Sequence, residues 1–422
     1  MKNLLSKTIK VFLLALVFCV TSQAAEPQWW KGNLHMHSLW SDGRIYPEVA
    51  VDVYKKMGYN FISLTDHSCI SQGERWTDLE TKYAKVSTYN VYMERFGADW
   101  IETREVDGKK QVRLKPLNEF RHLFEEPGKF MLIQGEEVTE YVHLNAINIV
   151  EEIPPKKIKT VKESIDFAVS SVHQQEQKYK QPMLLFLNHP NWRWKIKAED
   201  FIQEPNILFF ELYNSLLKDD AGDDMRVSVE RMWDIVLTRR LSEFKLPVIY
   251  GLGTDDTHYY LDSPDNGKYI PSAGRAWIMV RAKYLTPESI ITAMQAGDFY
   301  VSNGVLLDDV NFDGKTLNIK IKPAVGVEYI TEFLGTFVGY DADNLPVLDA
   351  NGNEINTTRK YSKDIGRVLK AVDGTQASYC LTGKEIYVRA RVRSDRLMKN
   401  SDIPDMLEMA WTQPVKGKST IK

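Results

Sequence analysis

The folded part of the chain opens with the stretch His35-Met36-His37-Ser38-Leu39-Trp40-Ser41-Asp42-Gly43. Two histidines that stand two residues apart on an extended strand point to the same side, so both imidazoles can reach one cation. On a helix the same two side chains would diverge. About thirty residues later the chain reaches Leu64-Thr65-Asp66-His67, where a third histidine follows an apolar run. The pattern therefore predicts strands whose ends carry a metal site.

Apolar runs and helical patterns alternate along much of the chain. Six runs have the length and composition of buried strands of a parallel sheet, and they span residues 60–64, 130–133, 142–149, 183–187, 207–212 and 248–252. Helical periodicity, twice with a proline in the favoured first turn, spans residues 47–57, 161–179, 225–244 and 287–296. A strand followed by a helix, repeated, predicts a β/α barrel or an open α/β sheet.

Six of the eight histidines lie in short polar frames beside these runs. In β/α folds the chemistry lies where strands end and loops begin. His143 is the exception, because it falls near the start of its run. The other candidate ligands follow their strands, and they are His67, Glu137, His189, Asp256 and His258.

These frames, in this order, resemble those of the PHP (polymerase and histidinol phosphatase) superfamily of metallohydrolases over roughly residues 32–303. The run Gly274-Arg275-Ala276-Trp277, followed by residues 285–288 and 296–304, is similar to the CehA/McbA-like branch. The resemblance implies a distorted (β/α)7 TIM-like PHP barrel that holds two or three divalent metal ions. Position by position, it implies metal ligands at His35, His37, Asp42, His67, Glu137, His143, His189, Asp256 and His258.

Two of these assignments have open alternatives. Asp42 stands where some relatives have a histidine, so it is either a ligand or a partner that orients one. Glu136 adjoins Glu137, and only the Gly-x-Glu spacing favours Glu137.

Residues near the expected ligands are candidates for contacting substrate. Arg275 precedes a predicted strand and could hold a phosphate or carbonyl oxygen as a fixed cation, or pair with an acidic neighbour. Trp192 and Arg193 follow His189 on a βα loop, where they could bind substrate or plug the barrel rim. We take Asp42 and Arg275 as candidate catalytic residues, and Arg275, Trp192 and Arg193 as candidate substrate-binding residues.

The ligand types predict the chemistry. Imidazole and carboxylate without thiolate favour zinc, manganese or iron, and a carboxylate that bridges two cations permits a multinuclear centre. Such a centre supplies hydroxide near neutral pH, so no protein nucleophile is needed. The sequence has no Gly-x-Ser-x-Gly elbow after a strand and no Gly-x-x-x-x-Gly-Lys loop, which argues against a serine hydrolase and a P-loop nucleotidase.

We therefore expect a metal-dependent hydrolase that cleaves a small-molecule phosphoester. One alternative keeps the metal centre and cleaves a carbamate or carboxylic ester. A second alternative is a non-catalytic protein that binds metal or glycan. Convergent arginines or lysines would favour phosphate, whereas an uncharged, aromatic-lined cleft would favour an ester.

The first 25 residues predict export. Lys2, Lys7 and Lys10 precede the apolar run 11–20, and small residues follow it, as in a secretory signal peptide. The run is about half the ~20 apolar residues that a membrane anchor needs, so we expect a periplasmic or extracellular protein without a membrane span. Removing the signal takes away three lysines and no acids, which moves the formal net charge from −3 to −6. A mildly acidic chain argues against nucleic acid as the main partner.

The length of the chain and the positions of its turn-forming residues predict the domain organisation. A mature chain of close to 400 residues exceeds what one compact core usually holds. After Gly304 helical periodicity fades, and short β-rich segments alternate with Gly, Asn and Asp. We expect a signal peptide at 1–25, the barrel at 26–304 and a small all-β, sandwich-like accessory domain at 305–422.

Two further features complete the expectation. Residues 69–128 are too many for a simple βα loop, and they predict an excursion with a helix near 83–96 and a hairpin around Asp107-Gly108. After the signal is removed Cys69 and Cys380 remain, too few for a disulfide scaffold.

Overall fold

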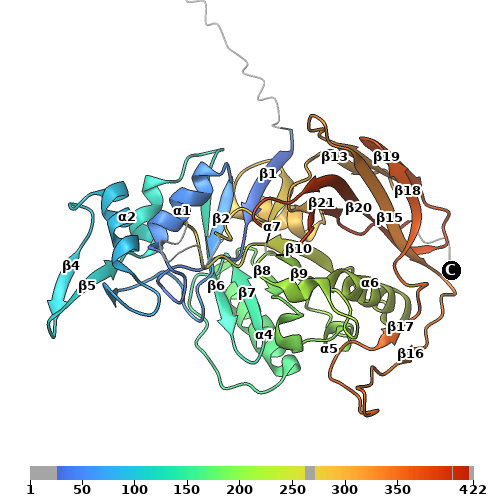
Figure 1. Ribbon diagram of the computed structural model, residues 1–422, viewed down its shortest axis with the longest axis horizontal. Coiled ribbons are helices and arrows are strands. Elements are labelled where there is room, and N and C mark those ends of the chain that lie inside the picture. Colours follow the sequence, from blue (N-terminus) through green and yellow to red (C-terminus); the bar gives the residue numbers. More distant parts are fainter. Residues whose placement is uncertain (1–25, 262–270, 402, 418–422) are drawn as a thin grey trace, which may run out of the picture.

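One thirteen-stranded sheet runs through the protein (Figure 1). The computed structural model describes residues 26–261, 271–401 and 403–417. In spatial order the strands of the sheet are β10 (Tyr250–Thr254), β9 (Phe209–Asn214), β8 (Leu184–Leu187), β7 (His143–Ile147), β6 (Met131–Thr139), β2 (Phe61–Leu64), β1 (Gln28–Asn33), β11 (Trp277–Ala282), β12 (Phe299–Ser302), β21 (Leu407–Thr412), β20 (Glu385–Leu397), β15 (Tyr329–Phe337) and β18 (Arg367–Asp373).

All six predicted apolar runs contain a strand, but the prediction of a parallel sheet is wrong for β7. This strand pairs antiparallel with both β6 and β8. Residues 140–142 alone connect β6 to β7, and a parallel crossover needs a dozen or more residues, so the chain must turn back as a hairpin. The start of β7 therefore lies beside the end of β6, where His143 pairs with Thr139.

A closed TIM-like barrel is not shown by this arrangement. In the described part of the chain, the segments that follow β1 and β10 meet through an isolated bridge between Met36 and Thr257, and β1 itself does not pair with β10. On its other side β1 pairs antiparallel with β11, and the sheet continues through β12 into the C-terminal strands. The fold is thus a mixed α/β structure around one long sheet.

Several of the described helices begin at residues that favour a helix start, a proline in the first turn or a threonine or serine N-cap. Helix α1 (Pro47–Lys56) has its proline in the first turn. Helix α4 (Val161–Tyr179) and helix α7 (Pro287–Gln295) have threonine N-caps that accept hydrogen bonds from backbone amides. Helix α6 (Val229–Arg239) starts after the serine N-cap Ser228, four residues later than predicted, and continues as a π-helical turn to Phe244.

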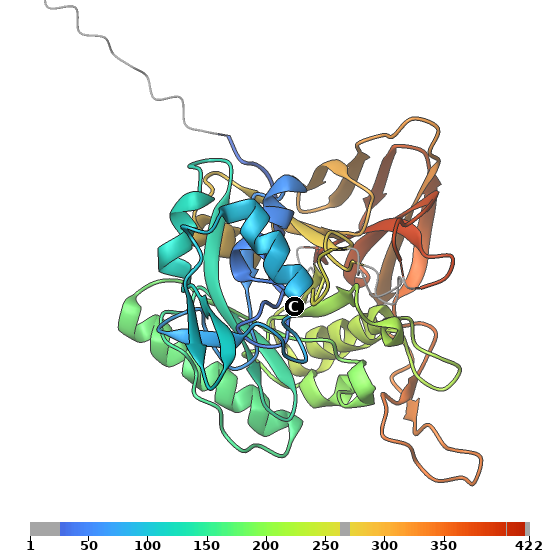
Figure 2. The ribbon, with the colours of Figure 1, turned by 60° about the vertical axis from the view of Figure 1, so that its left-hand side comes forward.

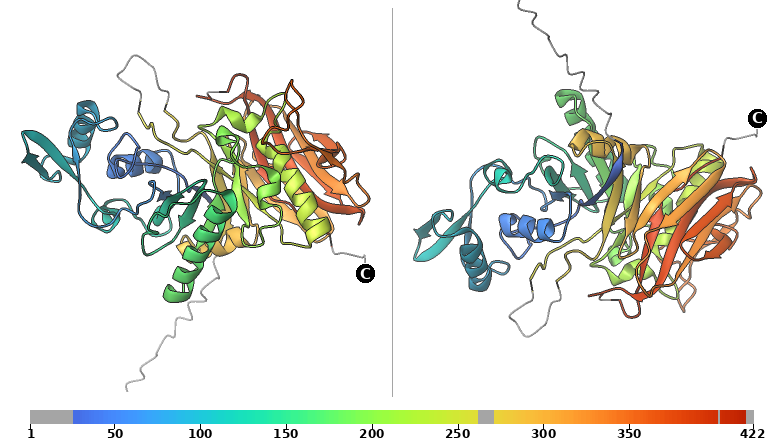
Figure 3. Two further views of the ribbon diagram at one scale, coloured as in Figure 1. Left: turned by 90° about the horizontal axis from the view of Figure 1, so that it is seen from below. Right: turned by 90° about the horizontal axis from the view of Figure 1, so that it is seen from above.

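The predicted excursion is confirmed as a separate small sheet with its own helices. Strands β3 (Arg75–Asp78), β5 (Lys109–Leu114) and β4 (Thr103–Val106) form it, beside helix α2 (Val86–Phe96) and helix α3 (Leu117–Phe120). The hairpin turn lies at Asp107-Gly108 as expected. Figures 2 and 3 show this insertion at the opposite end of the molecule from the C-terminal strands.

The main sheet continues into the C-terminal strands. A three-stranded sheet of β13 (Leu307–Phe312), β14 (Thr316–Ile321) and β19 (Gln376–Cys380) packs its apolar side chains against those of β15 and β20. These last two strands belong to the main sheet, which crosses residue 304 through the pairing of β12 with β21. An independent all-β domain is therefore not established, and the boundary at 304 stays a prediction.

Buried ion pairs fasten the C-terminal strands to α6. Arg389 of β20 is fully buried and donates two hydrogen bonds to Asp234, at 2.8 Å each, and a third to Glu230. Arg391 joins Glu230 to Glu332 of β15. We call these five residues the α6–β20 seam.

The predicted signal peptide lies outside the described residues. Among the helices that the structure describes, none combines the length and apolar character needed to span a bilayer.

Candidate metal centre

The His-x-His pair lies just beyond β1, where the backbone stays extended. Met36, between the two histidines, bridges to Thr257, and the amide of His37 donates to the Thr257 carbonyl at 2.9 Å. His35 and His37 are both fully buried, and their Nε2 atoms lie 3.2 Å apart. The two rings thus converge on one point, as the spacing predicts.

The residues after the pair fold back under it. Asp66 accepts hydrogen bonds from the Ser38 amide, the Ser38 hydroxyl and the Ser41 hydroxyl at 2.6–2.8 Å. Gly43 leaves no room for a side chain, because a Cβ there would lie 2.4 Å from the His37 backbone. Asp66 therefore holds the loop that presents Asp42, and is not itself in the cluster.

Glu137 lies at the middle of the cluster. It stands on β6 two residues after Gly135, where a Cβ would lie 2.4 Å from the hydroxyl of Ser63 on β2, so the glycine of the Gly-x-Glu pattern has a packing cause. The side chain is fully buried. Its two oxygens face different imidazoles: Oε1 lies 3.0–3.4 Å from nitrogens of His35, His143 and His189, and Oε2 lies 2.7 Å from His67 and 3.5 Å from His37.

A second set of side chains surrounds Asp42 at the more open side. Its Oδ1 lies 3.2 Å from His258 Nε2, 3.6 Å from His67 Nε2 and 3.7 Å from His37 Nδ1. Asp256 lies deeper, with Oδ1 3.1 Å from His37 Nε2.

Three groups in the described chain have ligand atoms close enough to hold a metal ion. They are His37 with Asp42, His67 and His258; His35 with His37 and Glu137; and His67 with Glu137 and His143. Each group shares a residue with each of the others. The two remaining predicted ligands border the groups, since His189 faces Glu137 and Asp256 faces both His35 and His37.

Charge coupling in the cluster keeps the carboxylates ionised. Against the effect of burial, neighbouring histidines hold the pKa of Glu137 and of Asp256 well below the usual range. Burial and the charge of His258 lower the pKa of His37 to about 4. At His67 burial lowers the pKa, but the nearby carboxylates of Glu137, Asp42 and Asp256 together raise it to about 9. A divalent cation would take the place of the protons that these carboxylates attract.

The donor set fits a metal ion. It consists of imidazole nitrogens and carboxylate oxygens, and the buried Glu137 Oε2 lies near two imidazole nitrogens, those of His67 and His37. His67 Nδ1 also lies 2.7 Å from the Thr139 hydroxyl. Cys69 is not part of any of the three groups, and its thiol donates to the Trp40 carbonyl.

The structure also separates Glu137 from its neighbour. Glu136 points to the other face of β6, where its carboxylate accepts a hydrogen bond from the Ile153 amide at 2.9 Å. Burial raises the pKa of Glu136 to about 8. This carboxyl therefore lies outside the cluster.

Glu211, within β9, orients His35 and His189 by hydrogen bonds. It is fully buried and accepts hydrogen bonds from His35 Nδ1 at 2.5 Å, the His189 amide at 2.7 Å and the Thr254 hydroxyl at 2.7 Å. With Nδ1 engaged, His35 presents Nε2 to the cluster. Asn214 links Glu211 to Asp256.

Asn188 is a supporting residue that the sequence did not indicate. Its amide group donates to Glu137 Oε1 at 2.8 Å and to Asn145 Oδ1 at 2.8 Å. The position directly before His189, at the end of β8, was the available signal.

The candidate substrate residues fall into two environments. Arg275 is buried, and its guanidinium donates to the carbonyls of Pro271 at 3.1 Å and Ser215 at 3.5 Å. Trp192 and Arg193 lie on the loop after His189, with the Trp192 ring 5.2 Å from the His189 ring. The catalytic and substrate-binding roles of these residues stay predictions.

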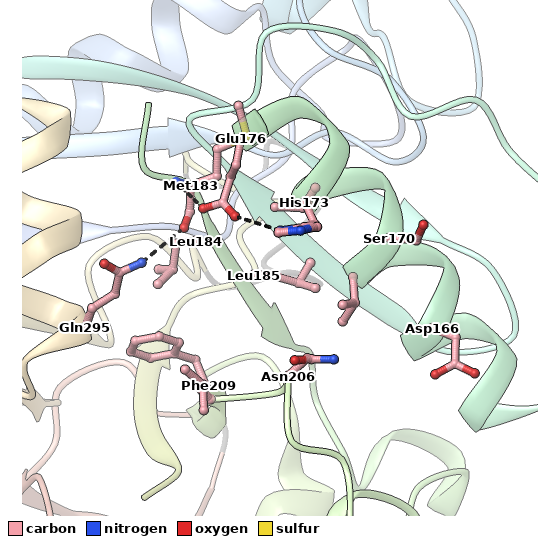
Figure 4. A pocket seen from close by; sticks show the side chains of 13 residues that line it. Asp166, Ser170, His173, Glu176, Met183, Leu184, Leu185, Asn206, Phe209 and Gln295 are labelled. Atoms are coloured by element: carbon pink, nitrogen blue, oxygen red, sulfur yellow. Dashed lines mark hydrogen bonds and ion pairs between the residues drawn. The ribbon is translucent and has the colours of Figure 1, made fainter. Parts of the chain in front are cut away.

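The remaining histidines lie away from the cluster. His173 is on the exposed side of α4, where it contacts Gln177 and Glu176. It borders a cavity of about 450 Å³ between α4 and the starts of β8 and β9 (Figure 4). The metal cluster lies at the other ends of these strands. His122 packs at 6.3 Å from the Trp100 ring in the insertion.

Comparisons with known proteins give partial likenesses. No family model matches the sequence. The DNA polymerase/3'-5' exonuclease PolX of Bacillus subtilis (strain 168) is 33% identical over 69 residues, which are 16% of this chain and 12% of that protein. The chain thus spans about an eighth of the length of this curated relative.

Two solved structures show weak overall similarity. A two-domain protein from Bacteroides vulgatus ATCC 8482 containing a predicted PHP-like metal-dependent phosphoesterase is 15% identical, with a TM-score of 0.40 over 92% of this chain and 96% of that chain. PsfC from Pseudomonas syringae PB-5123 is 11% identical, with a TM-score of 0.32 over 63% of this chain and 88% of that chain.

Proposed function

We propose that this chain is a metal-dependent phosphoesterase of the PHP superfamily. The observation that carries the proposal is the position of Glu137, whose two oxygens face separate sets of imidazoles within one buried cluster. A carboxylate so placed can bridge two cations. The interlocked groups would suit two or three ions, of zinc, manganese or iron.

Bound metal ions would supply hydroxide near neutral pH and would stabilise charge on the phosphoryl group. In the proposed reaction the oxygen of water forms the new bond to phosphorus, and the bond from phosphorus to the ester oxygen breaks. The alcohol leaves with a proton, and phosphate remains. Asp42 lies at the open side of the cluster, where 28% of its side chain is exposed, so it is placed to accept and pass on that proton.

Two observations support phosphorus over a carboxylic or carbamate ester. The partial relative is named as a 3'-5' exonuclease, an activity that cleaves phosphodiester bonds. Two cationic side chains, Arg193 and Lys195, also lie against the Trp192 ring, which packs on His143 and His189. The CehA/McbA-like branch, whose members include ester hydrolases, remains a finer proposal that rests on residues 274–277 and 296–304.

We also propose that the protein is exported and works in the periplasm or outside the cell. The support is the basic and apolar pattern of residues 2–25. Fractionation of cells that express the full chain would test it. Accumulation of the unprocessed chain in the cytosol would contradict it.

The decisive experiment measures metal content and bond preference together. The chain from residue 26 onward is purified, analysed for bound metal, and assayed with 4-nitrophenyl phosphate and 4-nitrophenyl acetate. We expect at least two metal ions per chain and phosphate release that His35→Ala abolishes, while the exposed helix variant His173→Ala keeps both. Ester turnover alone would favour the ester hydrolase, metal without turnover would favour a binding protein, and absence of metal would refute the proposal.

A further inference from the structure

The loop that follows β8 forms one wall of the metal centre. The Trp192 ring packs 5.1 Å from the His143 ring and 5.2 Å from the His189 ring, centroid to centroid. Both imidazoles face Glu137 on their other side. A substrate group that reaches the cluster from this side would therefore lie against the indole.

Two cations share this indole. The Arg193 guanidinium lies 4.6 Å from the Trp192 ring centroid, and the Lys195 ammonium lies 5.2 Å from it. Lys195 also donates to the Tyr141 carbonyl at 3.0 Å, which fixes its position. Burial and the Arg193 charge both lower the pKa of Lys195. Two like charges held together in this way disfavour one another unless an anion joins them.

Neither cation has a carboxylate partner in the part of the chain that the structure describes. Arg193 is exposed and Lys195 is partly buried. Elsewhere, Arg113, Arg281 and Arg391, which are partly buried, each lie within ion-pair distance of an acid. A cation–π contact at an exposed site contributes only about 0.5–1 kcal/mol, so stacking alone does not account for bringing two charges to one ring.

Three residues of the loop after β8 have backbone conformations that cost free energy. His189, Arg193 and Trp194 have φ values of 27°, 53° and 56°, in the left-handed region that residues other than glycine rarely adopt. Such conformations persist where the surroundings fix them, and they concentrate at functional sites. Here Asn191 is buried and donates to the carbonyls of Asp219 and Val227. The loop is therefore preformed.

We propose that Trp192, Arg193 and Lys195 form a recognition site for a second anionic group of the substrate. The substrate would carry the bond to be cleaved at the metal centre, a short planar or apolar body against Trp192, and a carboxylate or phosphate that Arg193 and Lys195 bind. This inference rests on the proposed function for the identity of the first group, but the anion site itself is testable without turnover.

The test compares two probes of equal shape and different charge. Isophthalate carries two carboxylates, and 3-carbamoylbenzoate carries one carboxylate and one neutral amide. Calorimetric titration of the metal-loaded chain should show isophthalate bound about 10-fold more tightly or better, since a hydrogen bond to a charged group is stronger than one to a neutral group. A third probe, 3-phosphonobenzoate, shows whether the second group is preferably phosphate-like or carboxylate.

Matched variants test whether the preference for isophthalate depends on the loop after β8. Arg193→Gln/Lys195→Met keeps the bulk of both side chains and should reduce the affinity ratio of the two probes to about one. Lys322→Ala/Lys384→Ala removes two exposed charges from the C-terminal strands and should keep the wild-type ratio. Trp192→Ala should weaken both probes together.

The outcomes separate this inference from the proposed function. Equal affinities in the wild type, binding of neither probe, or an unchanged ratio in Arg193→Gln/Lys195→Met would each overturn the anion site. The titration is repeated on metal-stripped protein, where a retained ratio still supports it. Failure of the chain to take up metal would count against the proposed function instead.

Discussion

The metal centre and the α6–β20 seam are both dense in buried charge, yet their carboxylates have different partners. In the seam, Asp234, Glu230 and Glu332 face arginines, which remain protonated at all ordinary pH values. In the metal centre, Glu137 and Asp256 face imidazoles, which lose their proton near neutrality and then bind cations. The difference shows how one chain uses buried acids to fasten its parts in one place and to offer an exchangeable site in another.

Removing the central carboxylate should break the metal centre most severely. In Glu137→Gln the side chain that faces both sets of imidazoles loses its charge, so we expect loss of at least one bound metal ion and a fall in kcat on the order of 10³-fold or more. Elemental analysis and phosphate release measure both. The control is Glu136→Gln, which faces away from the cluster. Equal metal content in Glu137→Gln and wild type would contradict the bridging role.

Breaking the seam should cost stability and leave the chemistry in place. Arg389→Ala leaves Asp234 and Glu230 buried without their main cation, and such a loss costs about 3–5 kcal/mol. Urea unfolding should show this change, while the folded fraction keeps its metal. Arg396→Ala, which breaks a more exposed pair with Glu408, should cost less than about 1 kcal/mol. Similar costs for both variants would refute the distinction.

Glu211 should matter for metal affinity without being a ligand. Glu211→Gln keeps the size of the side chain but weakens its hold on His35, so we expect metal affinity to fall about 10–100-fold with little change in fold. Competition with a chromogenic chelator measures the affinity. Glu48→Gln, at an equally buried acid that bonds Tyr92 and Trp100, serves as the control. Full retention of affinity in Glu211→Gln would exclude the orienting role.

Asp220 sharpens the comparison because it faces neither arginine nor imidazole. Burial raises its pKa well above the ordinary value, and its Oδ2 accepts a hydrogen bond from the Asn214 amide. The folded state thus holds a proton that the unfolded state releases above about pH 4, and stability falls as pH rises. Asp220→Asn should match the stability of the wild type near pH 4 and should be the more stable of the two at pH 8.

Thermal unfolding across that pH range measures the difference. A constant offset between Asp220→Asn and wild type at every pH would show that this carboxyl does not carry the proton.

Much of the site was predictable because its ligands are local to strand ends. The His-x-His spacing, the histidine after the second strand and the Gly-x-Glu frame each depend on neighbouring residues, and the structure brings them together. The antiparallel direction of β7 was not predicted, although the three residues between it and β6 leave room only for a hairpin. That reversal explains why His143 reaches the cluster from the start of its strand.

Long-range pairing accounts for what the sequence could not predict. The strand β21 was missed, and its partner β12 lies about a hundred residues earlier. The local pattern of apolar residues carries no information on the pairing partner of a strand. The partner depends on which strand edge of the sheet is free when the N-terminal and C-terminal parts of the chain come together. The role of Lys195 was also missed, because its proximity to Trp192 depends on the left-handed turn at Arg193 and Trp194.

The continuity of the main sheet past residue 304 has a consequence for truncating the chain at that residue. Strands β12 and β21 share backbone hydrogen bonds, so a chain that stopped at 304 would expose the amides and carbonyls of β12 as an open edge. Such an edge pairs readily with other chains. We therefore expect a chain cut at residue 304 to associate with other chains through this edge.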